Sequence, residues 1–199
     1  MKHFFLAAAV LASPFAAHQA NACAMRRPEQ IVVVANKPAM KDGMLQARAA
    51  ETRGERHTAI RLYEAVMNAP GDTAERAAAG VAAARLLALD GQQARAVARA
   101  QKAVGLNPRD AAAQLMVGEL LVNDEAGRAL THLKRAAALG VAGDEAIRLA
   151  LAQARAYKAF GDVANARIQL EAARNLGAET AAIAAIEIGL GGQVANSKI

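Results

Sequence analysis

The chain has 199 residues, of which 54% are hydrophobic and 21% are charged, and its formal net charge is +6. This balance is typical of a globular protein and argues against disorder along the whole chain. The basic residues are interspersed with acidic ones and have no aromatic side chains between them, which argues against a nucleic-acid-binding surface. The excess positive charge is therefore predicted to lie on a solvated surface.

Aromatic residues are scarce, with four Phe, two Tyr and no Trp, and three of the Phe lie within the first fifteen residues. The folded part must therefore build its core from Ala, Leu, Val and Ile. Because alanine side chains are short, such a core requires helices that approach one another closely.

Residues 1–22 have the pattern of a secretory signal peptide: a basic start, an apolar run from Phe4 to Ala12, and a small-x-small cleavage site at Ala20 and Ala22. The apolar run is too short to span a membrane, which takes roughly 20 residues. The mature chain is predicted to begin at Cys23 and to be periplasmic or secreted.

Cys23 allows a second interpretation, in which it is lipidated and the protein is an outer-membrane lipoprotein. Ala20 and Asn21 depart from the residues usual before a lipidated Cys. Membrane attachment is expected only if Cys23 is modified. A disulfide within the chain is excluded because there is no other Cys.

Residues 23–39 contain two prolines and one short β-branched run, Ile31 to Val34. The simplest interpretation is an N-terminal tether. The alternative is that the apolar tetrad docks on the helices that follow and partly occupies their groove.

A helical pattern begins near Met40. Four helical hairpins are predicted, with turns at Gly54, Gly91, Asn123-Asp124 and Gly161. Each returning helix has an alanine near its start, at Ala59, Ala96, Ala129 and Ala166, which lie 37, 33 and 37 residues apart. An Ala-rich bundle would not require this regularity, so the spacing favours a repeat array.

The hairpins resemble the tetratricopeptide repeat (TPR), whose 34-residue unit runs W-x2-L-G-x2-Y, then A-x3-F, then Pro. AIRLYEAVMNAP in the first hairpin matches the A-x3-F part, and Tyr157 matches the Tyr. In the second hairpin the small residues Gly80 and Ala83 stand where the repeat has Trp and Leu, and in the third hairpin Gly118 stands at the Gly position. The resemblance implies an all-α fold, a right-handed α-solenoid of about four TPR-like hairpins with a C-terminal capping helix.

Local signals set the helix ends. Asp72 and Glu75 are placed to form a capping box, and Asn107 is predicted to cap the next helix with Pro108 as its first residue. Residues 179–188 form the predicted capping helix. The organisation is then a signal peptide at 1–22, a tether at 23–39, a TPR-like domain at 40–190 and a flexible tail at 191–199.

Residues 40–190 contain no Ser, no Cys and no Gly-rich phosphate loop. Their two histidines, His57 and His132, lie near the starts of returning helices, where a surface or capping role is favoured over metal binding or acid–base chemistry. The sequence therefore predicts no enzyme, no catalytic residue, no metal site and no cofactor.

The resemblance implies a groove lined by the first helices of the hairpins, which receives a protein or peptide partner. We expect an exported scaffold or adaptor for an envelope complex, such as one for pilus, secretion or outer-membrane assembly. The alternative is a module that binds an anionic envelope polymer through Arg side chains. The candidate groove residues are Met44, Arg48, Val81, Arg85, Leu115, Glu119, Leu151 and Arg155.

Overall fold

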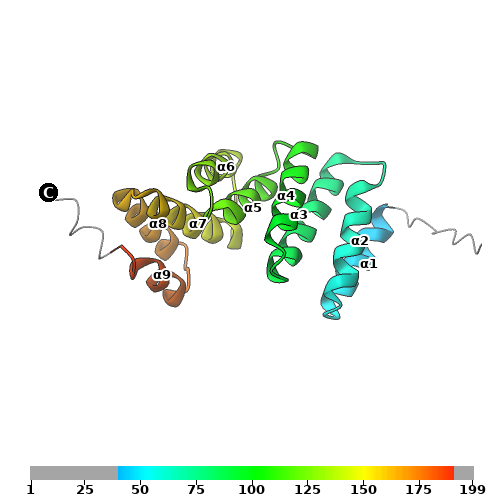
Figure 1. Cartoon of the computed structure of the whole chain (residues 1–199), viewed down its shortest axis with the longest axis horizontal. Coiled ribbons are helices and arrows are strands. Elements are labelled where there is room, and N and C mark those ends of the chain that lie inside the picture. The colour runs from blue at the N-terminus through cyan, green and yellow to red at the C-terminus, as the bar shows by residue number, and fades with distance from the viewer. Residues whose placement is uncertain (1–39, 191–199) are drawn as a thin grey trace, which may run out of the picture. The chain divides into compact units, whose positions relative to one another are not determined.

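The computed structural model describes residues 40–190 of the chain. The predicted signal peptide, the tether with Cys23 and Ile31 to Val34, and the predicted tail lie outside the described residues. The described range is all-helical and contains no β-strand. Its helices are α1 Met40–Thr52, α2 Arg56–Asn68, α3 Thr73–Leu89, α4 Gln93–Leu106, α5 Ala111–Leu121, α6 Ala126–Leu139, α7 Asp144–Phe160, α8 Val163–Asn175 and α9 Thr180–Glu187 (Figure 1).

The helices pair as four hairpins, α1–α2, α3–α4, α5–α6 and α7–α8, and each hairpin packs on the next in chain order (Figure 1). The first helices α3, α5 and α7 also contact one another in turn. Helix α9 packs on α7 and α8, as α5 packs on α3 and α4. The predicted fold, four stacked hairpins closed by a terminal helix, is confirmed.

Tight turns join the two helices of most hairpins. Gly91, between α3 and α4, has φ +73°, and Gly161, between α7 and α8, has φ +85°. Both values lie in the left-handed region, where a side chain would be strained, so glycine allows the chain to reverse in two or three residues. These predicted turn positions are confirmed.

The anchoring alanines Ala59, Ala96, Ala129 and Ala166 are all fully buried. Close helix approach also depends on glycine. A Cβ atom at Gly118 of α5 would lie 2.5 Å from Cγ of Leu133 on α6, and one at Gly80 of α3 would lie 3.1 Å from Cβ of Ala103 on α4. At each of these contacts at least one of the two facing residues is a glycine, so the helices approach closely and the core is tightly packed.

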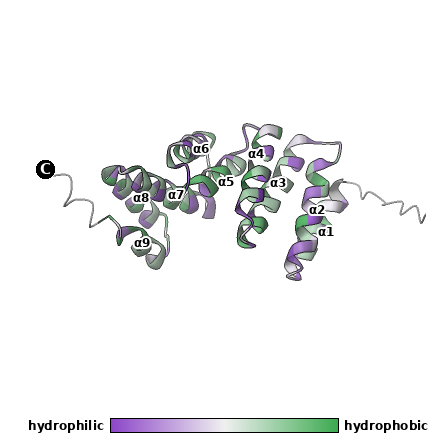
Figure 2. Ribbon diagram, viewed as in Figure 1, coloured by the Kyte–Doolittle hydropathy of each residue, from purple (hydrophilic) through white to green (hydrophobic). Residues whose placement is uncertain are grey.

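One apolar core runs through the described residues from α1 to α7, and a second joins α7, α8 and α9 through Leu170, Ile183 and Ile186. Tyr157 of α7 packs against both. Most helices carry hydrophobic residues, which pack into these cores, together with hydrophilic ones (Figure 2). No helix in residues 40–190 has the length and apolar character needed to cross a membrane.

One predicted helix start is wrong. Helix α5 begins at Ala111, and its N-cap is Asp110, whose carboxylate accepts a hydrogen bond from the backbone N of Ala113 at 3.1 Å. The side chain of Asn107 instead accepts from the backbone N of Arg109, and Pro108 lies in the turn before the helix. Asn107 and Asp110 both have side chains suited to an N-cap, and Asp110 occupies the N-cap position of α5.

The capping prediction for α3 is half met. The carboxylate of Asp72 accepts a hydrogen bond from the backbone N of Glu75 at 2.9 Å, which satisfies one free donor at the helix start. No reciprocal bond from the side chain of Glu75 to Asp72 is present among the described contacts. The acidic pair Asp144 and Glu145 does lie in the first turn of α7, where it faces the positive end of the helix dipole.

Candidate partner-binding face

The eight candidate groove residues lie in pairs on the first helices α1, α3, α5 and α7. We call the side of these helices that carries them the first-helix face. Arg48, Arg85 and Arg155 are exposed on it, and Glu119 is half-buried. Val81 and Leu151 are also partly covered by neighbouring side chains.

Leu115 is not available to a partner, because its side chain is completely buried. Helix α5 packs against α3, α4, α6 and α7, and every residue from Ala113 to Gly118 is buried. The expectation that Leu115 lines a groove is therefore corrected, and Leu115 is a core residue. Met44 is only 8% exposed and also belongs mainly to the core.

Two of the candidate groove residues, Arg85 and Glu119, form ion pairs within the protein. The guanidinium of Arg85 on α3 pairs with Glu51 on α1. Arg148 on α7 makes a two-point contact with Glu119 on α5, with Nε–Oε1 at 3.0 Å and Nη2–Oε2 at 2.5 Å. This hydrogen-bonded pairing raises the pKa of Arg148. Both ion pairs join the first helices of neighbouring hairpins.

Glu51 has a second partner. The hydroxyl of Tyr63 on α2 donates a hydrogen bond to Oε2 of Glu51 at 2.9 Å. Burial of the ring, with this hydrogen bond, raises the pKa of Tyr63 to about 12. Glu51 therefore connects α1, α2 and α3, and its charge is balanced by Arg85.

Two open clefts lie along α7 where it meets α9. The mixed cleft, of about 400 Å³, is lined by Asp144, Ile147, Arg148, Leu151, Gly177, Ala178, Glu179 and Ala182. The basic cleft, of about 340 Å³, is lined by Val122, Asn123, Arg155, Lys158, Ala159, Ala185 and Ile186. The structure thus places the candidates Leu151 and Arg155 in neighbouring clefts.

The basic cleft has two cations and no carboxylate in its lining. Lys158 donates a hydrogen bond from Nζ to the backbone O of Ile186 at 2.8 Å, and Arg155 donates from Nε to the backbone O of Leu151 at 3.3 Å. Within residues 40–190 neither cation has an acidic partner in ion-pair range. Among the described residues, backbone carbonyl oxygens are therefore their only hydrogen-bond partners.

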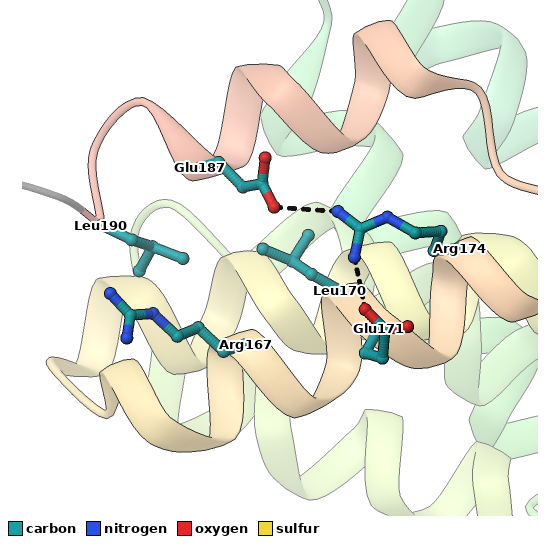
Figure 3. Close-up of a pocket in the computed structure, with 6 residues that line it drawn as sticks. All are labelled: Arg167, Leu170, Glu171, Arg174, Glu187 and Leu190. Carbon is teal, nitrogen blue, oxygen red and sulfur yellow. Dashed lines mark hydrogen bonds and ion pairs between the residues drawn. The ribbon is translucent and has the colours of Figure 1, made fainter.

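A third cleft, of about 380 Å³, lies between α8 and α9 (Figure 3). Its central cation, Arg174, bridges Glu171 on the same helix and Glu187 on α9, the latter at 3.1 Å. These acids raise the pKa of Arg174. Arg167 also lines this cleft and has no acidic partner among the described residues. The ion pairs of Arg174 hold α9 in place, and with two carboxylates in its lining this cleft offers less to an anionic ligand than the basic cleft does.

The second helices also carry arginines, among them Arg99, Arg135 and Arg174. Arg99 on α4 contacts Glu64 on α2, with Nε–Oε1 at 2.6 Å, so this residue also joins two hairpins. Arg135 on α6 is exposed and has no acidic partner within the described range. Arg135 is therefore the better reference for a purely solvated arginine.

The two histidines have local roles. His57 is exposed, with its Nδ1 3.8 Å from Asp90. His132 is partly buried, and its Nδ1 lies 2.8 Å from Oε1 of the buried Gln114. Burial, and then the neighbouring charges of Arg135 and Arg128, lower the pKa of His132. No cluster of residues suited to a metal ion is found in the described part of the chain.

The sequence-based list omitted Glu51, Arg148 and Lys158. Each lies three residues from a candidate on the same helix: Glu51 from Arg48, Arg148 from Leu151, and Lys158 from Arg155. Residues three apart share a helix face, so extending each candidate by one helical turn could have found all three.

Comparisons with known proteins give matches of fold. No family model matches the chain, and no curated protein matches it. Among solved structures, the MamA protein superposes with a TM-score of 0.60 and 20% identity, over 78% of this chain and 85% of MamA. A thermophilic TPR protein of Thermus thermophilus gives 0.58 and 20%, over 80% and 90%. The MamA RS-1 ArsTM double mutant gives 0.59 and 16%, over 82% and 97%.

The chain has the TPR fold. Three side-chain contacts between its first two hairpins join residues 34 apart: Glu51 with Arg85, Arg56 with Asp90, and Asn68 with Lys102. Equivalent positions in these two hairpins, such as Ala59 and Ala96, lie 37 residues apart, so these contacts join different positions of neighbouring units.

Proposed function

We propose that the protein is a non-catalytic scaffold that binds a protein partner on the first-helix face. Stacked TPR units offer a continuous surface built from several first helices, which suits an extended peptide or a helix. The observation that carries the proposal is the basic cleft, where the exposed Arg155 stands beside the exposed apolar side chains of Ala159 and Ala185. A cation next to apolar surface is the combination that protein interfaces use.

The test is a pull-down with the mature protein as bait, comparing two double charge reversals. Arg48→Glu with Arg155→Glu changes two exposed first-helix arginines. Arg61→Glu with Arg135→Glu makes the same change in charge on the second helices α2 and α6, at exposed residues that have no acidic partner in the described range.

The first double variant is expected to lose the captured partner and the second to retain it, with equal helicity by circular dichroism. Equal capture by both would remove the first-helix face from the proposal. Arg85 and Arg99 are unsuitable for reversal because each pairs with a glutamate on the preceding hairpin, Glu51 and Glu64. Reversing either would place two carboxylates together and disturb the fold.

Salt distinguishes this proposal from binding of an anionic polymer. Attraction between a polyanion and scattered arginines falls steeply with ionic strength, because exposed charges are screened over about 8 Å at physiological salt. A contact that also buries apolar surface persists. Capture that survives about 0.5 M salt supports a protein partner, whereas complete loss supports the polymer.

We further propose that the protein acts in the cell envelope, as part of a complex such as one for pilus, secretion or outer-membrane assembly. The support is the signal-peptide pattern of residues 1–22, with its small residues before Cys23. Intact-mass measurement of the exported protein is the test. An unmodified chain that begins at Cys23 supports a free periplasmic or secreted form, and added acyl mass would make it a lipoprotein.

A further inference from the structure

We propose that the basic cleft takes an acidic, amphipathic segment of a protein, in which carboxylate side chains flank an apolar side chain. This inference rests on the proposed scaffold function and names the chemistry of the partner. Three features of the cleft carry it: two cations on one side of α7, an apolar wall, and the absence of a carboxylate from the lining.

Helix α7 fixes the spacing of the cations. Arg155 and Lys158 are three residues apart, so both lie on the same side of the helix, about one turn from each other. Both line the cleft. Two carboxylates on neighbouring turns of a partner helix, or on alternate residues of an extended strand, would reach them together.

Both cations keep free donors. One proton of the Lys158 ammonium goes to the backbone O of Ile186, which leaves two for a ligand. Arg155 uses Nε for the backbone O of Leu151, which leaves its terminal NH₂ groups for a carboxylate. By contrast, Arg85 and Arg148 on the same face are already paired with Glu51 and Glu119. On this face, positive charge open to a ligand therefore remains at Arg48 and at the basic cleft, and two cations lie together only in the cleft.

The wall between the cations and α9 is apolar. Ala159 on α7 and Ala185 on α9 are its exposed members, whereas Val122 at the end of α5 and Ile186 on α9 are only 4% and 5% exposed. The volume of about 340 Å³ lies at the lower end of the range of ligand pockets. An anionic polysaccharide would satisfy the cations and leave the two exposed alanines in water. A peptide with one apolar side chain between two acidic ones satisfies both parts.

The neighbouring clefts fit this ligand less well. The mixed cleft contains Asp144 and Glu179, which would repel a carboxylate. In the cleft between α8 and α9, Arg174 is held by Glu171 and Glu187 (Figure 3). Charge complementarity therefore selects the basic cleft.

The test is fluorescence anisotropy of the full-length protein with labelled short peptides of alternating Glu and Leu. Two control peptides have Gln in place of Glu or Ser in place of Leu. We expect the Glu/Leu peptide to bind at least about tenfold more tightly than either control. Arg155→Glu with Lys158→Glu should remove the binding, and Arg61→Glu with Arg135→Glu should change it by less than about twofold.

Lys158 helps to hold α9, so its reversal could disturb the fold. Ala185→Glu is the second variant: Ala185 is exposed, and the added carboxylate would neutralise the cations from within the cleft. It should weaken the Glu/Leu peptide by about tenfold with unchanged helicity.

Equal binding of the Ser-containing peptide would overturn the proposal in favour of a ligand recognised by charge alone. Failure of the Glu/Leu peptide to bind would overturn it outright. A pull-down that still depended on Arg48 and Arg155 in that case would leave the scaffold function standing and reject only the acidic, apolar partner.

Discussion

Gly118→Ala tests how closely the helices of this array approach one another. Gly118 is buried on α5 and faces Leu133 on α6. An added Cβ would lie 2.5 Å from both Cγ and Cδ2 of Leu133, and 3.3 Å from the backbone O of Ala129. Favourable carbon–carbon contacts lie at about 3.5–4.0 Å. The methyl group therefore requires a shift of about 1 Å between the helices or a new rotamer of Leu133.

The expected result is a net loss of stability. Alanine favours an isolated helix over glycine by about 1 kcal/mol. Overpacking a closely packed core costs about 1–3 kcal/mol, and Leu133 is fully buried with no space to move into. The difference is a loss of up to about 2 kcal/mol, and in a domain of this size each kcal/mol lowers Tm by about 2–4 °C.

Gly105→Ala is the matched control, because Gly105 lies in the last turn of α4 with no atom within 4 Å of an added Cβ. It should leave stability unchanged or raise it by up to about 1 kcal/mol. Thermal melts and urea unfolding of both variants decide the question. If Gly118→Ala were stabilised as much as Gly105→Ala, the close packing of α5 on α6 would be refuted.

Three further changes test individual contacts. Ala96→Leu should cost about 1–3 kcal/mol in thermal unfolding because Ala96 is fully buried, whereas the exposed Arg95→Ala should cost less than about 1. Tyr63→Phe removes the hydrogen bond to Glu51 and should cost about 0.5–1.5 kcal/mol in urea unfolding. Because burial lowers the pKa of His132, the unfolded chain binds this proton first, so stability should fall as pH drops below about 6.5. That pH dependence should be weaker in His132→Gln; an equal slope would assign it to other groups.

The fold could be predicted because it repeats. Glycines at the turns and alanines at the starts of the returning helices recur at similar intervals, and each has a simple physical reason: a left-handed backbone angle in Gly91, or a side chain small enough for close packing in Ala96. One turn glycine or one buried alanine is a weak signal, but such signals repeated at similar intervals through four hairpins constrain the whole array.

The start of α5 could not be predicted with the same certainty. Asn107, followed by Pro108, forms a good start signal, and Asp110 forms an equally good one three residues later. The side chain of Gln114 donates a hydrogen bond from Nε2 to the backbone O of Pro108 at 3.0 Å, and its Oε1 lies 2.8 Å from Nδ1 of His132 on α6. The second contact joins two helices and is not visible in local sequence.

The candidate site was harder to predict than the fold because equivalent positions differ in exposure. Leu115 and Leu151 occupy the same place in their hairpins, yet Leu115 is fully buried in the crowded α5, while Leu151 lines a cleft near α9. The ion pair of Arg85 with Glu51 spans 34 residues and becomes evident only once the hairpins are stacked. The sequence indicated which helices form the face, and the structure showed which of its charges are free.

Site-specific photo-crosslinking tests the scaffold claim most directly. The crosslinker is placed in the full-length protein as Ala159→p-benzoylphenylalanine on α7, and in a matched variant as Arg135→p-benzoylphenylalanine on α6. Both positions are exposed, and only the first lines the basic cleft. Irradiation in cells is expected to give a discrete protein adduct from position 159 and none from position 135. Adducts from position 135 alone, or none from position 159, would contradict partner binding on the first-helix face.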